Sequence, residues 1–193
     1  MVVLPLLSFV GSAFFLIVLI TINILNRDLQ FKKDALSKYA KGERGWLLTL
    51  GFYSIGMSQV LLSVILANVY TFSYGLLLLA VAGSGTLLVG GFKMEFPKES
   101  IRGYLHTLGA GMQFLFFPAA LILMRDQFPS AITEKITLLV GSMTALFGVY
   151  IFYVFLKGTT HHLPYFGIIQ KTNILLMTVW VVLISFLEIY ISF

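Results

Sequence analysis

Residues 46–69 read WLLTLGFYSIGMSQVLLSVILANV, and this stretch decides the fold. It contains no Asp, Glu, Lys or Arg. A run of about 20 mainly apolar residues is long enough to cross the roughly 30 Å hydrocarbon layer of a bilayer as an α-helix. Its apolar residues run continuously and do not alternate with polar ones, which excludes a strand of a porin-like barrel. The stretch therefore predicts a transmembrane helix.

Five further apolar stretches of the same kind lie before and after it, and the connections between them are short. Helices joined by short connections pack as antiparallel neighbours. We therefore expect an all-α, polytopic transmembrane bundle of six helices, which forms a single domain over residues 1–193. The longest polar segment, residues 26–45, has room for a short interfacial helix. The expected spans are residues 2–25, 46–69, 74–92, 101–124, 136–156 and 168–190.

The composition supports this class of protein. Hydrophobic residues make up 59% of the chain and charged residues 11%, whereas soluble domains have about 45–50% and about 25%. The net charge of +5 does not indicate nucleic-acid binding, because the basic residues lie in short segments between the apolar stretches. Basic residues in such segments contact anionic lipids, so membrane lipids are the expected partners. The absence of Cys excludes disulfides, Cys-ligated zinc and thiol nucleophiles.

The basic residues also predict the orientation of the chain. Six spans place both termini on one side and three loops on the other, and only Arg125 and Lys135 fall on the side of the termini. The positive-inside rule then places the termini outside and the three basic loops in the cytoplasm, in a cell (inner or plasma) membrane. The basic residues of those loops are Arg27, Lys32, Lys33, Lys38, Lys41, Arg44, Lys93, Lys98, Arg102, Lys157 and Lys171.

Two glutamines lie deep inside the expected spans. Gln59 follows Trp46 by 13 residues and Gln113 follows Ile101 by 12, which places both about 18–20 Å from the basic side. An amide without a partner costs several kcal/mol in hydrocarbon. The two glutamines either bond to each other as a clamp between helices, which is the simpler interpretation, or line a polar cavity. His106 shares the helix face of Gln113.

Titratable residues gather on the basic side, and three interpretations of them remain open. Glu95, His106, His161 and His162 are ligand types for zinc or iron, but they lack a tight ligand spacing, so no metal or other cofactor is expected. A pair of Glu95 and His106 suits proton transfer near neutral pH. The third interpretation is a set of interfacial anchors and solvated side chains. No G-x-S-x-G, Walker or H-E-x-x-H signature is present, so the sequence leaves enzymatic activity open.

The same residues lie in segments that resemble a family of bacterial and archaeal membrane proteins, the domain of unknown function 998. The resemblance covers residues 37–171. Residues 37–46 read SKYAKGERGW, similar to the family's Ser-x-x-x-x-Gly-x-x-Gly-Trp pattern. The later matches are Gly90-Gly91-Phe92 with Glu95 and Pro97, Leu105-His106 with Pro118, and Gly167 with Gln170-Lys171. The family usually has Asp where this chain has Glu95 and Arg where it has Lys171. The resemblance implies a six-helix fold and a polar site, without a named reaction.

We expect a protein that binds a lipid or a small amphipathic ligand at a polar pocket on its basic face. A role as a small subunit of a larger membrane complex or as a homo-oligomer is equally compatible with the sequence. One alternative is a membrane-embedded enzyme that acts on a lipid-like substrate through His106 and Glu95, and a second is a small proton-coupled transporter. The expected ligand-binding residues are Ser37, Arg44, Trp46, Glu95, His106, Gln170 and Lys171.

Overall fold

The computed structural model describes residues 2–26, 29–93, 100–157 and 164–191. These residues form helices and no strand, which confirms the predicted all-α fold. Six of the helices are long and apolar enough to cross a membrane, so the chain is a multi-pass integral membrane protein. The helices are α1 (Val3–Leu25), α2 (Leu36–Tyr39), α3 (Gly45–Val69), α4 (Tyr74–Gly91), α5 (Ile101–Met124), the 3-10 turn η1 (Arg125–Gln127), α6 (Ala131–Lys157) and α7 (Phe166–Ile191).

The predicted spans agree with the six long helices except at the start of α6. This helix begins at Ala131, five residues before the predicted start. Its first turns include the charged residues Glu134 and Lys135. The prediction started the span at the first residue of the apolar run, so it missed these turns. The short helix expected within residues 26–45 is present as α2.

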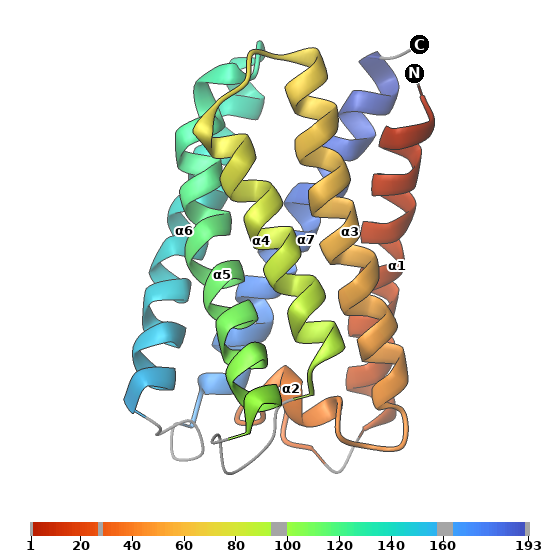
Figure 1. Cartoon of the computed structure of the whole chain (residues 1–193), viewed down its shortest axis with the longest axis vertical. Helices are drawn as coiled ribbons and strands as arrows, with labels where there is room; N and C mark the ends of the chain where they lie inside the picture. Colours follow the sequence, from red (N-terminus) through yellow and green to blue (C-terminus); the bar gives the residue numbers. More distant parts are fainter. Residues whose placement is uncertain (1, 27–28, 94–99, 158–163, 192–193) are drawn as a thin grey trace.

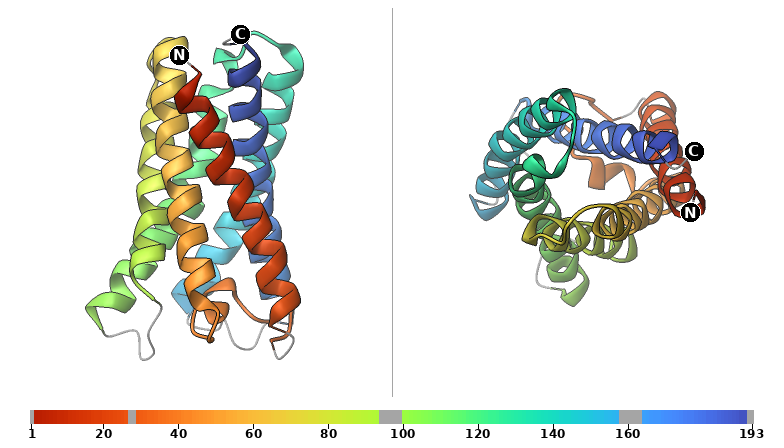
Figure 2. Two further views of the ribbon diagram at one scale, coloured as in Figure 1. Left: turned by 90° about the vertical axis from the view of Figure 1, so that its right-hand side faces the viewer. Right: turned by 90° about the horizontal axis from the view of Figure 1, so that it is seen from above.

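The six long helices form a closed ring (Figures 1 and 2). Along the chain, α1 packs against α3, α3 against α4, α4 against α5, α5 against α6 and α6 against α7, which returns to α1. Helices that follow one another in the sequence are therefore neighbours, as short connections require. The view along the bundle in Figure 2 shows the helices arranged around a common axis.

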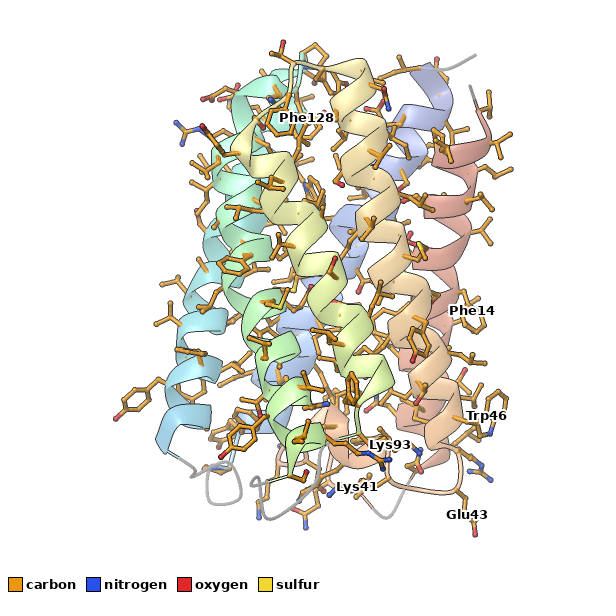
Figure 3. The ribbon with its side chains drawn as sticks, in the orientation of Figure 1. Phe14, Lys41, Glu43, Trp46, Lys93 and Phe128 are labelled. Carbon is orange, nitrogen blue, oxygen red and sulfur yellow. The ribbon has the colours of Figure 1, made fainter. Side chains whose placement is uncertain are left out.

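The two ends of the ring differ in character. Both chain termini lie at one end, which we call the terminal end (Figure 1). Helix α2 lies at the other end, which we call the basic end because Lys41 and Lys93 lie there (Figure 3). The side chain of Phe128 marks the terminal end in the same view.

Glycines allow α4 and α5 to approach closely. A Cβ atom on Gly85 would lie 2.7 Å from the carbonyl oxygen of Gly109, and a Cβ atom on Gly109 would lie 2.5 Å from the carbonyl oxygen of Gly85. Real Cβ atoms do not approach backbone oxygens so closely. Because lipid supplies no hydrophobic force between helices, close packing of this kind must hold α4 and α5 together.

Candidate functional site

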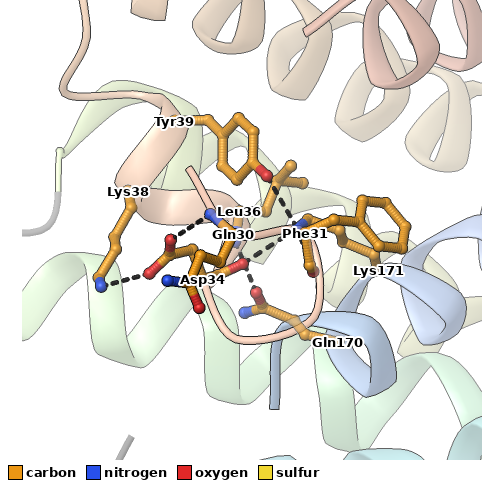
Figure 4. Close-up of polar contacts among 8 residues, drawn as sticks. All are labelled: Gln30, Phe31, Asp34, Leu36, Lys38, Tyr39, Gln170 and Lys171. Atoms are coloured by element: carbon orange, nitrogen blue, oxygen red, sulfur yellow. Dashed lines mark hydrogen bonds and ion pairs between the residues drawn. The ribbon is translucent and has the colours of Figure 1, made fainter. Parts of the chain in front are cut away.

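Residues 29–40, which we call the plug, cover the basic end of the ring and include α2 (Figures 1 and 4). Leu36 is 1% exposed, and its backbone N–H donates to Gln170 Oε1 of α7 at 2.8 Å. Gly167 lets the start of α7 approach the plug, because a Cβ atom there would lie 2.6 Å from the carbonyl oxygen of Asp34. Gly167 and Gln170 therefore dock the plug onto α7.

Lys171 fastens the plug from the next position of α7 (Figure 4). Its Nζ donates to the carbonyl oxygens of Phe31 at 2.8 Å and Asp34 at 3.1 Å, and to the hydroxyl of Tyr39 at 3.1 Å. It also lies 4.4 Å and 4.6 Å from the ring centroids of Phe31 and Tyr39. Burial and the nearby Asp34 carboxylate raise the pKa of Tyr39, so its hydroxyl stays protonated. An ammonium group has three N–H donors, and the plug uses all three.

Directly behind the plug lies a cavity of about 40 Å³, which we call the central cavity. Helices α1, α3, α4, α5 and α7 line it, together with α2. Its apolar walls are Phe15, Leu36, Phe52, Ile55, Val89, Ala110, Phe114, Ile174 and Met177. Its polar lining is Ser37, Gln59, Thr86, His106, Gln113, Gln170 and Thr178. Among these described lining residues there is no Asp, Glu, Lys or Arg, so His106 is the single lining residue with an ionisable side chain.

An incomplete amide network lies in the middle of the ring. Thr86 Oγ1 lies 2.6 Å from Gln113 Oε1, 3.4 Å from Gln59 Oε1 and 3.1 Å from the carbonyl oxygen of Ala82. A hydroxyl has one hydrogen to donate, so it cannot satisfy all three acceptors together. Gln113 Nε2 donates to the sulfur of Met177 at 3.2 Å, a weak acceptor.

Gln59 is the least satisfied member of this network. Its side chain is 0% exposed, and its Nε2 has no hydrogen-bond partner within the described part of the chain. The expected direct clamp between Gln59 and Gln113 is therefore replaced by an indirect link through Thr86, and both amides line the central cavity.

His106 lines the cavity nearer the basic end. Helix α5 places it there, beginning after Ser100, whose hydroxyl accepts from the backbone N–H of Gly103 at 3.0 Å. His106 Nδ1 lies 2.7 Å from the carbonyl oxygen of Phe92, which can only accept, so Nδ1 carries the hydrogen. The ring is 5% exposed and is held in one orientation by this bond.

The predicted site residues thus separate into two groups. Ser37, His106 and Gln170 line the central cavity with the two glutamines. Lys171 is used by the plug, as described above. Arg44 donates to the carbonyl oxygen of Leu25 at 3.0 Å in an exposed position, and Trp46 is 57% exposed at the basic end (Figure 3). The role of these residues in ligand binding stays a prediction.

Glu95, His161 and His162 lie outside the described residues. The metal-site interpretation depends on all three, and the proton-transfer interpretation depends on Glu95. Of the residues in these two interpretations, His106 is the one that the structure describes.

Thr86 is a cavity residue that the sequence did not reveal. A threonine in an apolar helix usually bonds to the carbonyl oxygen four residues earlier, as Thr86 also does with Ala82. Nothing in its local sequence distinguishes it from threonines whose hydroxyl makes only this bond, such as Thr107 on α5. Thr86 lies on α4, between the helices that carry Gln59 and Gln113, and near both amides. This position could be recognised from the sequence only if the order of the helices around the ring were known.

Comparison with known proteins gives one informative result. A family model with the description "Protein of unknown function (DUF998)" matches residues 9–187, from α1 to α7. No curated protein and no solved structure matches the chain. The match includes the segments on which the resemblance was recognised, from the plug to the start of α7. The chain therefore belongs to the DUF998 family of proteins of unknown function.

Proposed function

We propose that this membrane protein binds an uncharged amphipathic molecule, whose polar group enters the central cavity and accepts a hydrogen bond from Gln59. The observation that carries the proposal is the buried, unpartnered Gln59 Nε2 beside a cavity. A buried donor without a partner costs about 1–3 kcal/mol, and more in hydrocarbon. A ligand that supplies an acceptor oxygen removes this cost when it binds.

The charge of the lining supports an uncharged polar group. The described lining residues provide carboxamides, hydroxyls and one imidazole, with no charged side chain to pair with a phosphate or an ammonium group. Bringing an unpaired charge into such a site is far more costly than bringing in a carbonyl or hydroxyl group. Lys171, which follows the lining residue Gln170 in the sequence, has its three donors bonded to the plug.

The size of the cavity supports the entry of a headgroup and not of a whole lipid. Its volume of about 40 Å³ exceeds the roughly 10–15 Å³ that one water molecule needs. It is far below the roughly 300–1,000 Å³ of a pocket that encloses a drug-sized molecule. A carbonyl or glycerol group fits this scale, and Phe52, Phe114 and Ile174 supply apolar contacts for the first carbons of an attached chain.

A monoacylglycerol that carries a diazirine and an alkyne on its acyl chain tests this proposal. Purified protein is irradiated with the probe, and the labelled peptides are identified. We expect saturable labelling of peptides from α3, α4 or α5. In Q59L the labelling falls about fivefold to tenfold, the effect of losing one hydrogen bond of about 1–1.5 kcal/mol.

Two comparisons make the result specific. S63A is the matched control, because Ser63 lies one turn further along α3, is buried, and bonds only within the helix to the carbonyl oxygen of Val60. Labelling of S63A should equal that of the wild type. A lysophosphatidic acid with the same acyl chain should label the cavity weakly. Equal labelling of Q59L and wild type, or stronger labelling by the charged probe, contradicts the proposal.

A further inference from the structure

A second cavity lies at the terminal end, far from the central cavity. Its volume is about 170 Å³, and it lies where the end of α7 meets the segment between η1 and α6. Phe128, which marks the terminal end in Figure 3, forms part of its wall. We call it the terminal cavity. None of its lining residues is shared with the central cavity, so the two are separate candidate sites.

A buried carboxylate lines the terminal cavity. Glu188 of α7 is 2% exposed, and the hydroxyl of Tyr70 donates to its Oε1 at 3.1 Å. Burial and the charge of Glu188 raise the pKa of Tyr70 to about 12, so the hydroxyl remains a donor to the carboxylate at neutral pH. Glu188 makes further interactions within the protein. A carboxylate has about four acceptor positions, and the Tyr70 hydroxyl occupies one of them.

The rest of the lining complements a cation. The rings of Tyr70 and Phe128 stand edge to face, with centroids 5.9 Å apart, and both line the cavity. Aromatic faces attract cations. Ser130 and Thr133 add two hydroxyl oxygens that can accept hydrogen bonds. The described lining residues include no Lys, Arg or His, and Glu188 is the one carboxyl group among them.

We propose that the terminal cavity binds a primary ammonium group, with Glu188 as its counter-charge. A primary ammonium group has three N–H donors, which suit one carboxylate and two hydroxyl oxygens. A hard metal ion fits less well, because it requires six or more oxygen ligands and gains nothing from an aromatic wall. The proposal is independent of the function proposed for the central cavity.

Two sources can supply such a group. One is the headgroup of an aminophospholipid, since the cavity lies at the end of the spanning helices, where headgroups are found. The other is a small free amine. Native mass spectrometry of the purified protein with equimolar phosphatidylethanolamine and phosphatidylcholine of identical acyl chains tests the first source. These lipids have the same net charge and differ in the three ammonium hydrogens.

We expect wild type to retain phosphatidylethanolamine about tenfold over phosphatidylcholine, as for a charge-assisted hydrogen bond. E188Q should lose the preference. E134Q removes the same charge from the start of α6, outside the cavity lining, and should keep it. N-acetylated phosphatidylethanolamine, which lacks the ammonium group, should not be preferred by the wild type. The comparison with the N-acetylated lipid uses only the wild-type protein, so it tests the proposal even if E188Q folds poorly.

Ethanolamine tests the second source. The chain has two tryptophans, and the W46F variant leaves Trp180, whose ring centroid lies 6.4 Å from that of Phe128. A saturable change in Trp180 emission with ethanolamine that is absent in W46F/E188Q, without a lipid preference, assigns the site to a small free amine. A preference for phosphatidylethanolamine that depends on Glu188 assigns it to the lipid headgroup. Wild type that shows neither effect overturns the proposal.

Discussion

Gln59 and Gln113 are the same residue type at similar depth in the membrane, yet their amides differ in hydrogen bonding. Gln113 uses both ends of its amide, through Thr86 and Met177, whereas Gln59 Nε2 has no partner within the described part of the chain. A buried amide donor that only a ligand can satisfy lowers the stability of the protein when the ligand is absent. Residues that serve function in this way are the ones whose replacement stabilises a fold.

Leucine substitutions at the two positions should therefore have opposite effects. Q59L removes an unsatisfied donor and should stabilise the ligand-depleted protein by about 1 kcal/mol, whereas Q113L breaks two contacts and should destabilise it by a similar amount. Thermal unfolding in detergent measures both. A lower melting temperature for Q59L would show that Gln59 has a structural partner and would remove the main support for the central site.

Asp34 gives the plug a dependence on pH. Burial by itself would raise its pKa, but the hydrogen bonds from Lys38 and from the backbone N–H of Gln30 outweigh it, and the net pKa lies below its ordinary value of 3.8 (Figure 4). Between the lowered and the ordinary pKa, the unfolded chain binds more protons than the folded chain. The stabilisation by Asp34 is therefore complete above the ordinary pKa and is lost as the pH falls through the lowered pKa.

The D34N variant tests this direction of the pH dependence of stability. The difference in melting temperature between wild type and D34N should be constant from pH 7 to pH 5 and should shrink below about pH 4, where Asp begins to protonate. A difference that grows as the pH falls would mean that the folded pKa of Asp34 is raised. K33M, a change at an exposed neighbouring residue, should show no such dependence.

At the scale of helices, the contact between α4 and α5 depends on two glycines. G109A places a methyl group 2.5 Å from a backbone oxygen, which no side-chain rotation can relieve, so the two helices must separate. We expect a loss of about 1–3 kcal/mol, the usual cost of overpacking. G111A is the matched control on the same helix, because the nearest atom to its Cβ is Phe152 Cε2 at 3.8 Å. Thermal unfolding should distinguish them clearly, and equal stability of the two variants would contradict the close contact between Gly85 and Gly109.

The sequence could predict the helices because each span is a continuous apolar run, but it could not predict which face of each helix turns inward. In a bilayer, lipid-facing and inward-facing side chains are both apolar: Leu77 of α4 is 50% exposed and Leu79 is 0% exposed. The order of the helices around the ring follows from packing between segments that are distant in sequence. The contacts of Thr86 with the two glutamines depend on this order.

The same limit applied to the candidate site. Gln59, Gln113 and His106 could be recognised because polar side chains in a span require an explanation. The role of Lys171 could not, because its three acceptors come from a segment 132 to 140 residues earlier, and two of them are backbone oxygens without a sequence signature. Glu188 was overlooked for a similar reason, since its partner Tyr70 lies 118 residues away in sequence.

At the scale of the whole molecule, the basic end is expected to face the cytoplasm. The chain contains no Cys, so a single introduced cysteine is the sole thiol. Phe72, between α3 and α4, is 65% exposed on the terminal end, and Lys33 is exposed on the basic end. A membrane-impermeant maleimide should label F72C in intact cells and K33C only after permeabilisation. The reverse pattern would place the plug outside the cell.

The central claim is that the ring holds the polar end of an uncharged amphiphile against Gln59. Native mass spectrometry of the wild-type protein, extracted in mild detergent without added lipid, tests it most directly when the retained molecules are identified and Q59L is measured in parallel. The wild type should carry an uncharged, oxygen-bearing amphiphile that Q59L lacks. A bare wild-type mass, or the same retained molecules in both proteins, would contradict the claim.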